Sequence, residues 1–298
     1  MKNIIHFLVA FCVFPFVQKR IKEKNINIMS TLDTVRYLVL NDKSSLIRFG
    51  DGEINILCKR NGPKFQQTTY KLYEKLWNVF RSTDDNVLLC LPRYLNCSYI
   101  NDDLKFVSKN WWKSYIVRRK KFIVEEIPDG RVWGDTQITR PYMDCTGDFC
   151  QNVFDCIKEL FYKKNIVIVE GSKTRFGIGN DLLDSASSVR RILCPAINAF
   201  EKYNEILEAC KSVDRPDLFV LCIGPTAKIL GLELHSIGCR AIDLGHLDIE
   251  YEWFISKSKV KTTVKNKFVN EAGNNSFADD NSELYLNKYR EQVVCEVQ

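Results

Sequence analysis

Two carboxylates stand two positions apart in the run Arg48-Phe49-Gly50-Asp51-Gly52-Glu53, directly after an apolar stretch of strand length. Carboxylate oxygens suit a hard divalent cation such as Mg²⁺ or Mn²⁺, which takes waters and substrate phosphate oxygens as its other ligands. The two glycines let the backbone approach a ligand closely. A solvated acidic turn, or a helix capped by Asp51, is the structural alternative, and the short motif alone favours that alternative.

A second segment combines glycines with basic residues after the apolar run 166–169, and it reads Glu170-Gly171-Ser172-Lys173-Thr174-Arg175-Phe176-Gly177-Ile178-Gly179-Asn180-Asp181. We expect helical residues to follow this segment, so that its backbone N–H groups and the helix N-terminus would bind a diphosphate. Neither Walker A spacing nor Gly-x-Gly-x-x-Gly is present, so a plain connecting loop is an equal alternative. A weaker case of the same kind is Cys222-Ile223-Gly224-Pro225-Thr226, in which Thr226 would cap the next helix.

A third segment is acidic. Four acidic residues and one histidine fall between Asp243 and Glu252, next to Trp253. In an extended segment, one face would carry every second residue, namely His246, Asp248, Glu250 and Glu252. Such a group would share a cation or supply a general base. An exposed acidic face is an equal alternative.

Strands and helices that would position these segments alternate along the chain. The predicted strands are residues 45–49, 86–91, 165–169, 191–196, 218–223 and 240–244. The predicted helices are about ten residues from Ser30, then residues 70–80, 103–117, 149–162, 203–210 and 226–234. This alternation predicts an α/β fold with a largely parallel sheet covered by helices on both faces. Ligands of such sheets bind beyond the carboxyl ends of the strands, where all three segments lie.

Composition narrows the class of protein. The chain has 298 residues, of which 45% are hydrophobic and 27% charged, so it forms a globular core. The formal net charge is +6, but the basic residues are spread out, so we expect no nucleic-acid partner. Twelve cysteines include no CxxC and no zinc spacing, which favours free thiols in a reducing compartment and a cytoplasmic location.

The two ends of the chain differ from its body. Residues 4–17 are mostly apolar and are followed by Lys19, Arg20, Lys22 and Lys24. The apolar run is shorter than the about 20 residues that span a membrane, and it lacks a small-residue cleavage site. Three alternatives stay open: contact of residues 1–24 with the inner face of a membrane, a packed helix, and a true anchor. We expect an apolar and basic segment at 1–29, one domain at 30–272, and a polar tail at 273–298.

Several long motifs, taken together and in this order, resemble those of the GT-D-fold glycosyltransferases, formerly the domain of unknown function 1792 family. They are residues 48–53, Gly179-Asn180-Asp181-Leu182-Leu183-Asp184, Cys222-Ile223-Gly224-Pro225-Thr226-Ala227 and Gly245-His246-Leu247-Asp248-Ile249-Glu250-Tyr251-Glu252-Trp253. The likeness runs from about Ser30 to Glu271. The resemblance implies a Rossmann-like domain that moves a sugar from a UDP-sugar to a glycan acceptor, in cell-surface polysaccharide or glycoprotein glycan synthesis.

The resemblance also implies roles for single residues. Asp51 and Glu53 occupy the family's Asp-x-Glu motif and, with His246, are the expected ligands of Mn²⁺ or Mg²⁺. The expected contacts of the UDP-sugar are Arg48, Gly50, Gly171, Lys173, Arg175, Gly179, Asn180, Gly224 and Thr226. An inverting reaction needs a general base, for which Glu250 is the first choice, followed by Glu252 and Asp248. The alternatives are a metal-dependent nucleotide-sugar or phosphoester hydrolase and a non-catalytic nucleotide-sugar-binding relative.

Overall fold

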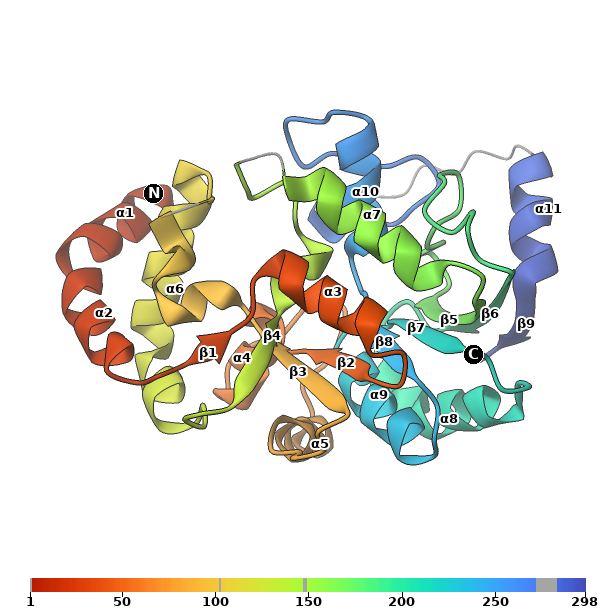
Figure 1. The fold of residues 1–298 in the computed structure, drawn as a ribbon, viewed down its shortest axis with the longest axis horizontal. Helices are drawn as coiled ribbons and strands as arrows, with labels where there is room; N and C mark the ends of the chain where they lie inside the picture. Colours follow the sequence, from red (N-terminus) through yellow and green to blue (C-terminus); the bar gives the residue numbers. More distant parts are fainter. Residues whose placement is uncertain (1, 102, 147–148, 272–282) are drawn as a thin grey trace.

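The computed structural model describes residues 2–101, 103–146, 149–271 and 283–298. Within these ranges, nine strands form one sheet in the order β1-β4-β3-β2-β8-β7-β5-β6-β9, and each neighbouring pair is parallel (Figure 1). The strands are β1 (Asn27–Ile28), β2 (Ser45–Arg48), β3 (Val87–Leu91), β4 (Val132–Asp135), β5 (Asn165–Gly171), β6 (Ser188–Cys194), β7 (Leu218–Cys222), β8 (Ala241–Asp243) and β9 (Val293–Glu296). The predicted α/β class is confirmed.

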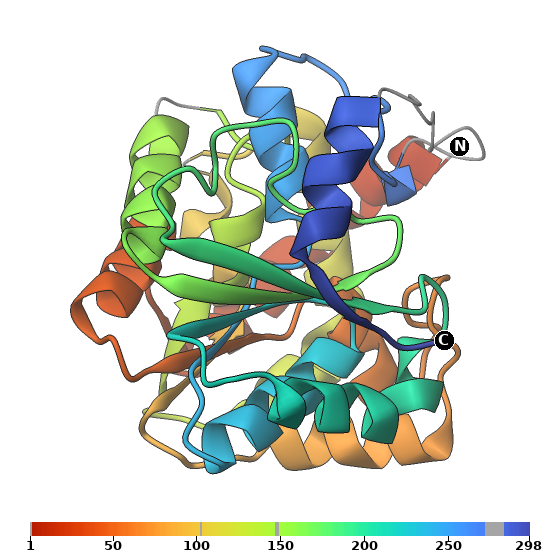
Figure 2. The ribbon, with the colours of Figure 1, turned by 90° about the vertical axis from the view of Figure 1, so that its right-hand side faces the viewer.

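Helices cover both faces of this sheet (Figure 2). They are α1 (Lys2–Cys12), α2 (Phe14–Lys22), α3 (Thr31–Leu40), α4 (Asp51–Leu57), α5 (Tyr70–Phe80), α6 (Phe106–Glu125), α7 (Phe149–Phe161), α8 (Tyr203–Ser212), α9 (Thr226–Ser236), α10 (Leu247–Ile255) and α11 (Glu283–Gln292). Successive strand residues join opposite cores: Leu46 packs with residues of α3 and α7, whereas Ile47 packs with residues of α5, α8 and α9. Two buried faces explain why the strands are continuously apolar.

Local signals placed most of these elements correctly. All six predicted strands are present as β2, β3, β5, β6, β7 and β8, with small shifts at their ends. Helix α3 begins after Ser30, whose hydroxyl accepts the Asp33 N–H at 3.1 Å, as its N-cap sequence predicts. Helix α5 begins in the same way after Thr69, whose side chain accepts the Leu72 N–H at 3.2 Å.

Other segments differ from the expectation. Residues 172–187 form turns and lead directly into β6, so the helix expected after the loop at 170–181 is absent. The acidic segment is helix α10, not an extended strand, so the shared face of alternate residues expected for an extended segment is wrong. Of the predicted tail, residues 273–282 lie outside the described residues. The remainder forms α11 and β9, and β9 pairs with β6 at the edge of the sheet.

The centre of the sheet has a topological switch point. Strands β2 and β8 are neighbours, but the chain leaves β2 toward β3 on one side and leaves β8 toward β9 at the opposite edge. Helices α4, α10 and α9 begin three or four residues beyond the carboxyl ends of β2, β8 and β7. Ligands of open α/β sheets bind in the crevice at such a point, so we expect the ligand site near Asp51 and His246.

Candidate active site

A buried ionic network supports the end of β2. The Arg48 guanidinium donates to the backbone oxygen of Asp243 at 2.8 Å and to its carboxylate at 2.9 Å. The Lys228 ammonium lies 3.0 Å from the other oxygen of Asp243 and 3.0 Å from Oε1 of Glu53. Burial alone would raise the pKa of Asp243, but the Arg48 and Lys228 cations lower it. Two cations and two carboxylates thus neutralise one another and link β2, β8, α4 and α9.

Glu53 is fixed by this network. Its Oε2 accepts the Gly50 N–H at 3.0 Å, as the third helical residue of a capping box does, while Oε1 pairs with Lys228. The side chain is 8% exposed. Both carboxylate oxygens of Glu53 therefore already have partners within the protein.

Asp51 has a different environment. It is exposed to water, yet its pKa is raised, mainly because surrounding protein displaces water, while Arg140 lowers the pKa and Glu53 raises it. We call this place, where Asp51 is exposed and its carboxyl lies near Arg140 and Glu53, the recess. The backbone oxygen of Asp51 accepts the Tyr115 hydroxyl at 3.1 Å, which fixes the start of α4 against α6.

Three further polar side chains belong to this recess. Nη2 of Arg140 lies 2.6 Å from Oε1 of Glu271, and Nε2 of His246 lies 3.5 Å from Oε2 of the same carboxylate. Burial and the Arg140 cation lower the pKa of His246 to about 3, so its imidazole is neutral near pH 7. Among the described residues, Nε2 of His246 makes no hydrogen bond. We name Asp51, Arg140, His246 and Glu271 the recess cluster.

Glu250 lies directly below the loop that carries Arg140. Its Oε2 accepts the backbone N–H groups of Tyr142 at 3.1 Å and Met143 at 2.9 Å, and the residue is fully buried. Burial raises the pKa of Glu250, although Arg140 and the two N–H donors oppose this. Its Oε1 has no hydrogen-bond partner within the part of the chain that the structure describes.

Asp248 and Glu252 lie one turn apart on α10 and share the Lys267 ammonium at 2.7 Å each. Both also accept the Asn180 side-chain amide, and Asp248 accepts the Gly177 N–H at 2.9 Å. The spacing of four residues in a helix explains why these two share a face, whereas Glu250 points elsewhere. Asp248, Glu252 and Lys267 thus fix the loop after β5 to α10.

The expected nucleotide contacts divide into two places. Gly50 precedes Asp51, and Arg48 lies in the network beneath the recess. Gly171 is the last residue of β5, and Lys173, Arg175 and Gly179 belong to the loop that follows it. Strand β7 separates β5 from β8 in the sheet. Because this loop joins two strands, it presents no helix N-terminus. Its Arg175 is buried and donates to the Asn266 carbonyl at 3.2 Å.

Gly224 and Thr226 lie nearer the recess, at the start of α9. Gly224 has a φ of +58°, a conformation that favours glycine, and a Cβ there would collide with the Phe65 ring. Thr226 is fully buried and is the first residue of α9, so the expected cap by Thr226 is wrong: Pro225 holds the N-cap position, and the Thr226 hydroxyl has no hydrogen-bond partner among the described residues. Lys228 of the same helix reaches Glu53. These two residues therefore adjoin the network rather than the loop after β5.

Arg140, Glu271 and Lys228 were not predicted. Arg140 follows β4 through the short 3-10 helix Thr136–Thr139, and β4 has too few apolar residues to be recognised from sequence. Lys228 is a cation within an apolar helix, which was a usable signal because such a residue needs a buried partner. Glu271 lies in an irregular segment that gives no sequence signal.

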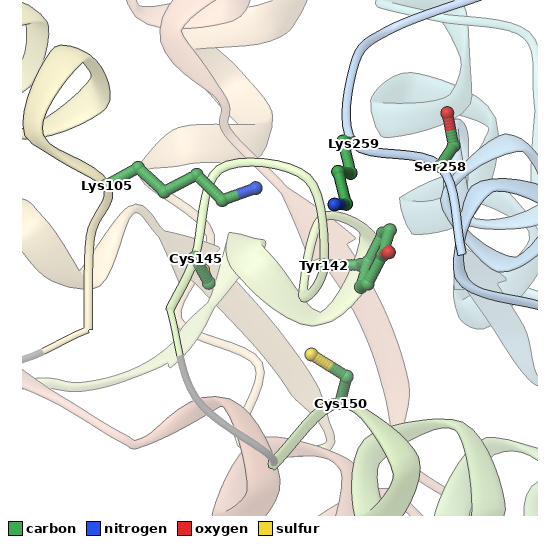
Figure 3. Close-up of a pocket in the computed structure, with 6 residues that line it drawn as sticks. All are labelled: Lys105, Tyr142, Cys145, Cys150, Ser258 and Lys259. Atoms are coloured by element: carbon green, nitrogen blue, oxygen red, sulfur yellow. The ribbon is translucent and has the colours of Figure 1, made fainter.

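A cavity of about 440 Å³ adjoins the loop that follows Arg140, and Figure 3 shows the side chains around it. It is lined by Lys105, Tyr142, Cys145, Cys150, Ser258 and Lys259. None of these six was predicted. The same loop carries Arg140 to the recess cluster and Tyr142 to the cavity, so the two spaces are neighbours that share a wall.

Comparisons with known proteins show which family the chain resembles. A family model described as glycosyltransferase GT-D fold matches residues 46–272. Glycosyltransferase GlyD of Streptococcus pneumoniae is 30% identical over 289 residues, which are 94% of this chain and 34% of GlyD. A probable glycosyl transferase, Gly, of Streptococcus gordonii is 32% identical over 252 residues, which are 84% of this chain and 36% of that protein. The chain spans about a third of the length of these curated relatives.

A solved structure gives the same result. It is described as a highly conserved domain of unknown function 1792 with a distinct glycosyltransferase fold. The sequences are 31% identical, the TM-score is 0.87, and the match covers 96% of this chain and all of the solved chain.

Proposed function

This chain belongs to the glycosyltransferase GT-D-fold family, and on that premise we propose that it transfers a sugar from a UDP-sugar to a glycan hydroxyl, assisted by Mn²⁺ or Mg²⁺. The observation that carries the proposal is the recess cluster at the switch point of the sheet. It combines an accessible carboxylate, a guanidinium and a neutral imidazole. The free state of all twelve cysteines fits a reducing, cytoplasmic setting.

The residues present could hold a metal ion only when oxygens of the bound substrate complete its coordination. Within the described ranges, no three His, Cys, Asp or Glu side chains are grouped so that they could hold an ion by themselves. Asp51 is open to water and offers a direct ligand, and Nε2 of His246 offers a second donor. Glu53 is committed to Lys228 and Gly50, so we assign it to holding Asp51 and α4 in place. Mg²⁺ and Mn²⁺ sites of this kind are completed by water and phosphate oxygens.

The proposed reaction needs cations where UDP departs. The metal, when bound, stabilises the negative charge that develops on the β-phosphate. Arg140 provides a planar guanidinium for two phosphate oxygens. The N-termini of α4, α9 and α10 converge on the same place, and each favours an anion. Arg140 would exchange part of its pairing with Glu271 for the diphosphate.

Glu250 remains our choice for the general base. Its raised pKa and unpartnered Oε1 suit a group that takes a proton from an acceptor hydroxyl. Asp248 and Glu252 are less suited, because both are neutralised by Lys267. Glu250 is fully buried beneath the loop at Arg140–Met143, so this role requires the loop to open for the acceptor hydroxyl.

We assign the cavity beside Tyr142 to the acceptor glycan. It is concave, it offers an aromatic ring and two ammonium groups, and it shares the Arg140 loop with the recess cluster. Clefts of about 300–1,000 Å³ are the usual size of ligand sites.

Transfer from a panel of UDP-sugars, assayed with and without acceptor oligosaccharides, tests the proposed reaction. We expect metal-dependent transfer that Asp51→Asn abolishes and Asp214→Asn leaves unchanged, because Asp214 is exposed before the amino end of β7. Rapid turnover that needs no acceptor would instead identify a nucleotide-sugar hydrolase. Binding of UDP with no turnover of any kind would identify a non-catalytic relative.

A further inference from the structure

Helix α1 presents an apolar stripe to solvent. Ile4, Phe7, Leu8 and Phe11 are 63%, 45%, 53% and 74% exposed. Their spacing of three and four residues places them on one side of the helix. The Phe7 ring stacks on Phe11 at 6.3 Å and meets Phe106 of α6 at 6.4 Å. We name Ile4, Phe7, Leu8, Phe11, Phe106 and Val107 the apolar patch.

The apolar patch is separate from the residues that the N-terminal helices bury in the core. Helix α2 buries Phe14, Val17 and Ile21, and both N-terminal helices pack beside α6 at one end of the molecule (Figure 1). Phe16 of α2, in contrast, is 80% exposed. A soluble protein rarely exposes a continuous apolar surface of this kind without a partner.

Basic residues lie on the two helices that pack with α1. Lys19, Arg20 and Lys22 are exposed on α2, and Lys109 and Lys113 follow Phe106 at three and seven residues along α6. Burial and the neighbouring Lys109 lower the pKa of Lys113, so these two cations lie close together. Helices α1 and α2 contain no acidic residue. Apolar residues flanked by Lys and Arg are the pattern of segments that lie in an anionic membrane interface.

We propose that α1, α2 and the start of α6 dock this chain on an anionic lipid surface. The apolar patch enters the boundary between headgroups and acyl chains, and the basic residues contact the headgroups. In the described residues, no helix is long and apolar enough to cross a membrane. A symmetric second copy is a poorer occupant, because it would bring two sets of basic residues together with no acidic partner from α1 or α2.

Docking would also orient the proposed acceptor cavity. Lys105 lines the cavity, and the next residue, Phe106, belongs to the apolar patch. The cavity mouth would then lie beside the lipid headgroups. This consequence rests on the proposed glycosyltransferase function, whereas the docking itself does not.

Vesicle sedimentation of the whole chain tests the docking. We expect binding to phosphatidylcholine vesicles that contain phosphatidylglycerol and little binding to phosphatidylcholine alone. The double variant Phe7→Asp, Phe11→Asp should lose the binding. A matched control is Leu40→Asp, because Leu40 is 82% exposed on α3, away from the patch. Changing Lys19 and Arg20 to Gln should weaken binding roughly thirtyfold, since each basic residue at such a surface contributes about 1 kcal/mol.

Two results would overturn the docking proposal. One is equal sedimentation of the double variant and the Leu40 control. The other is a dimer by light scattering that Phe11→Asp dissociates, without lipid binding by the original chain, which would make a second copy the partner. Circular dichroism of each variant checks that the fold is intact. No sugar or nucleotide enters the assay, so its failure would leave the proposed enzymatic function unaffected.

Discussion

Lys228→Met should destabilise the protein strongly, because Lys228 is 3% exposed and is the shared cation of two buried carboxylates. Its removal leaves Glu53 and Asp243 with only Arg48 as a counterion in the network. Loss of one partner from a buried ion pair costs about 3–5 kcal/mol. With an m value of about 3 kcal/mol per molar urea, the unfolding midpoint should fall by roughly 1–1.7 M.

Urea unfolding followed by tryptophan fluorescence measures this difference, and its pH dependence adds a second test. In the original chain, the lowered pKa of Asp243 contributes stability that is present above the unfolded pKa, about 3.9, and lost as pH falls through the folded pKa. Without Lys228, Asp243 binds a proton more readily in the folded state, because one of the two cations that lower its pKa is gone. The gap between the two proteins should therefore be widest near pH 7 and narrow toward pH 4.

Lys71→Met is the matched control, because Lys71 is exposed on α5 and such changes usually stay within about 0.5 kcal/mol. A Lys228→Met variant as stable as this control would refute the network. A gap that widens toward pH 4 would also contradict it.

Three further predictions concern the site. Glu250→Gln should lower turnover by about 10²–10⁴-fold and retain UDP affinity, which initial rates and calorimetry would measure. Loss of UDP affinity would instead identify Glu250 as a ligand of the nucleotide. Tyr142→Ala should raise the KM of the acceptor and leave that of the donor unchanged, and an effect on the donor alone would contradict the assigned cavity. His246 has a pKa lowered to about 3, so its protonation in the unfolded state destabilises the fold below about pH 6.5. By pH 5, the free energy of unfolding should therefore fall by about 1–2 kcal/mol less in His246→Gln than in the original chain. The same pH dependence in both proteins would show that the imidazole is charged in the folded protein.

The strands and most helices were predictable because their signals are local. Continuous apolar runs such as residues 166–169 indicate strands buried on both faces, and Ser30 and Thr69 mark helix starts through their own side chains. Strand β4 was missed because Trp133 is flanked by Gly134 and Asp135, so its burial depends on tertiary packing. Helix α10 was left open because acidic residues at every second position fit a strand period as well as a helix in which Asp248 and Glu252 share one face.

The candidate site was predictable in part for the same reason. Asp51 and His246 follow strands that the sequence reveals, and the structure brings both to the recess. Arg140 and Glu271 come from segments without a recognisable signal, and only the fold places them there. The pairing of Asp248 and Glu252 with Lys267 depends on contacts across the chain that no local pattern encodes.

The most direct test of the account is calorimetric titration of UDP into the original chain and into Asp51→Asn, with Mn²⁺ and then with EDTA. The account predicts UDP binding that requires Mn²⁺, that Asp51→Asn removes, and that Asp214→Asn retains. UDP binding of equal affinity in EDTA, or unchanged binding by a folded Asp51→Asn, would contradict a metal-assisted nucleotide site at the carboxyl end of β2.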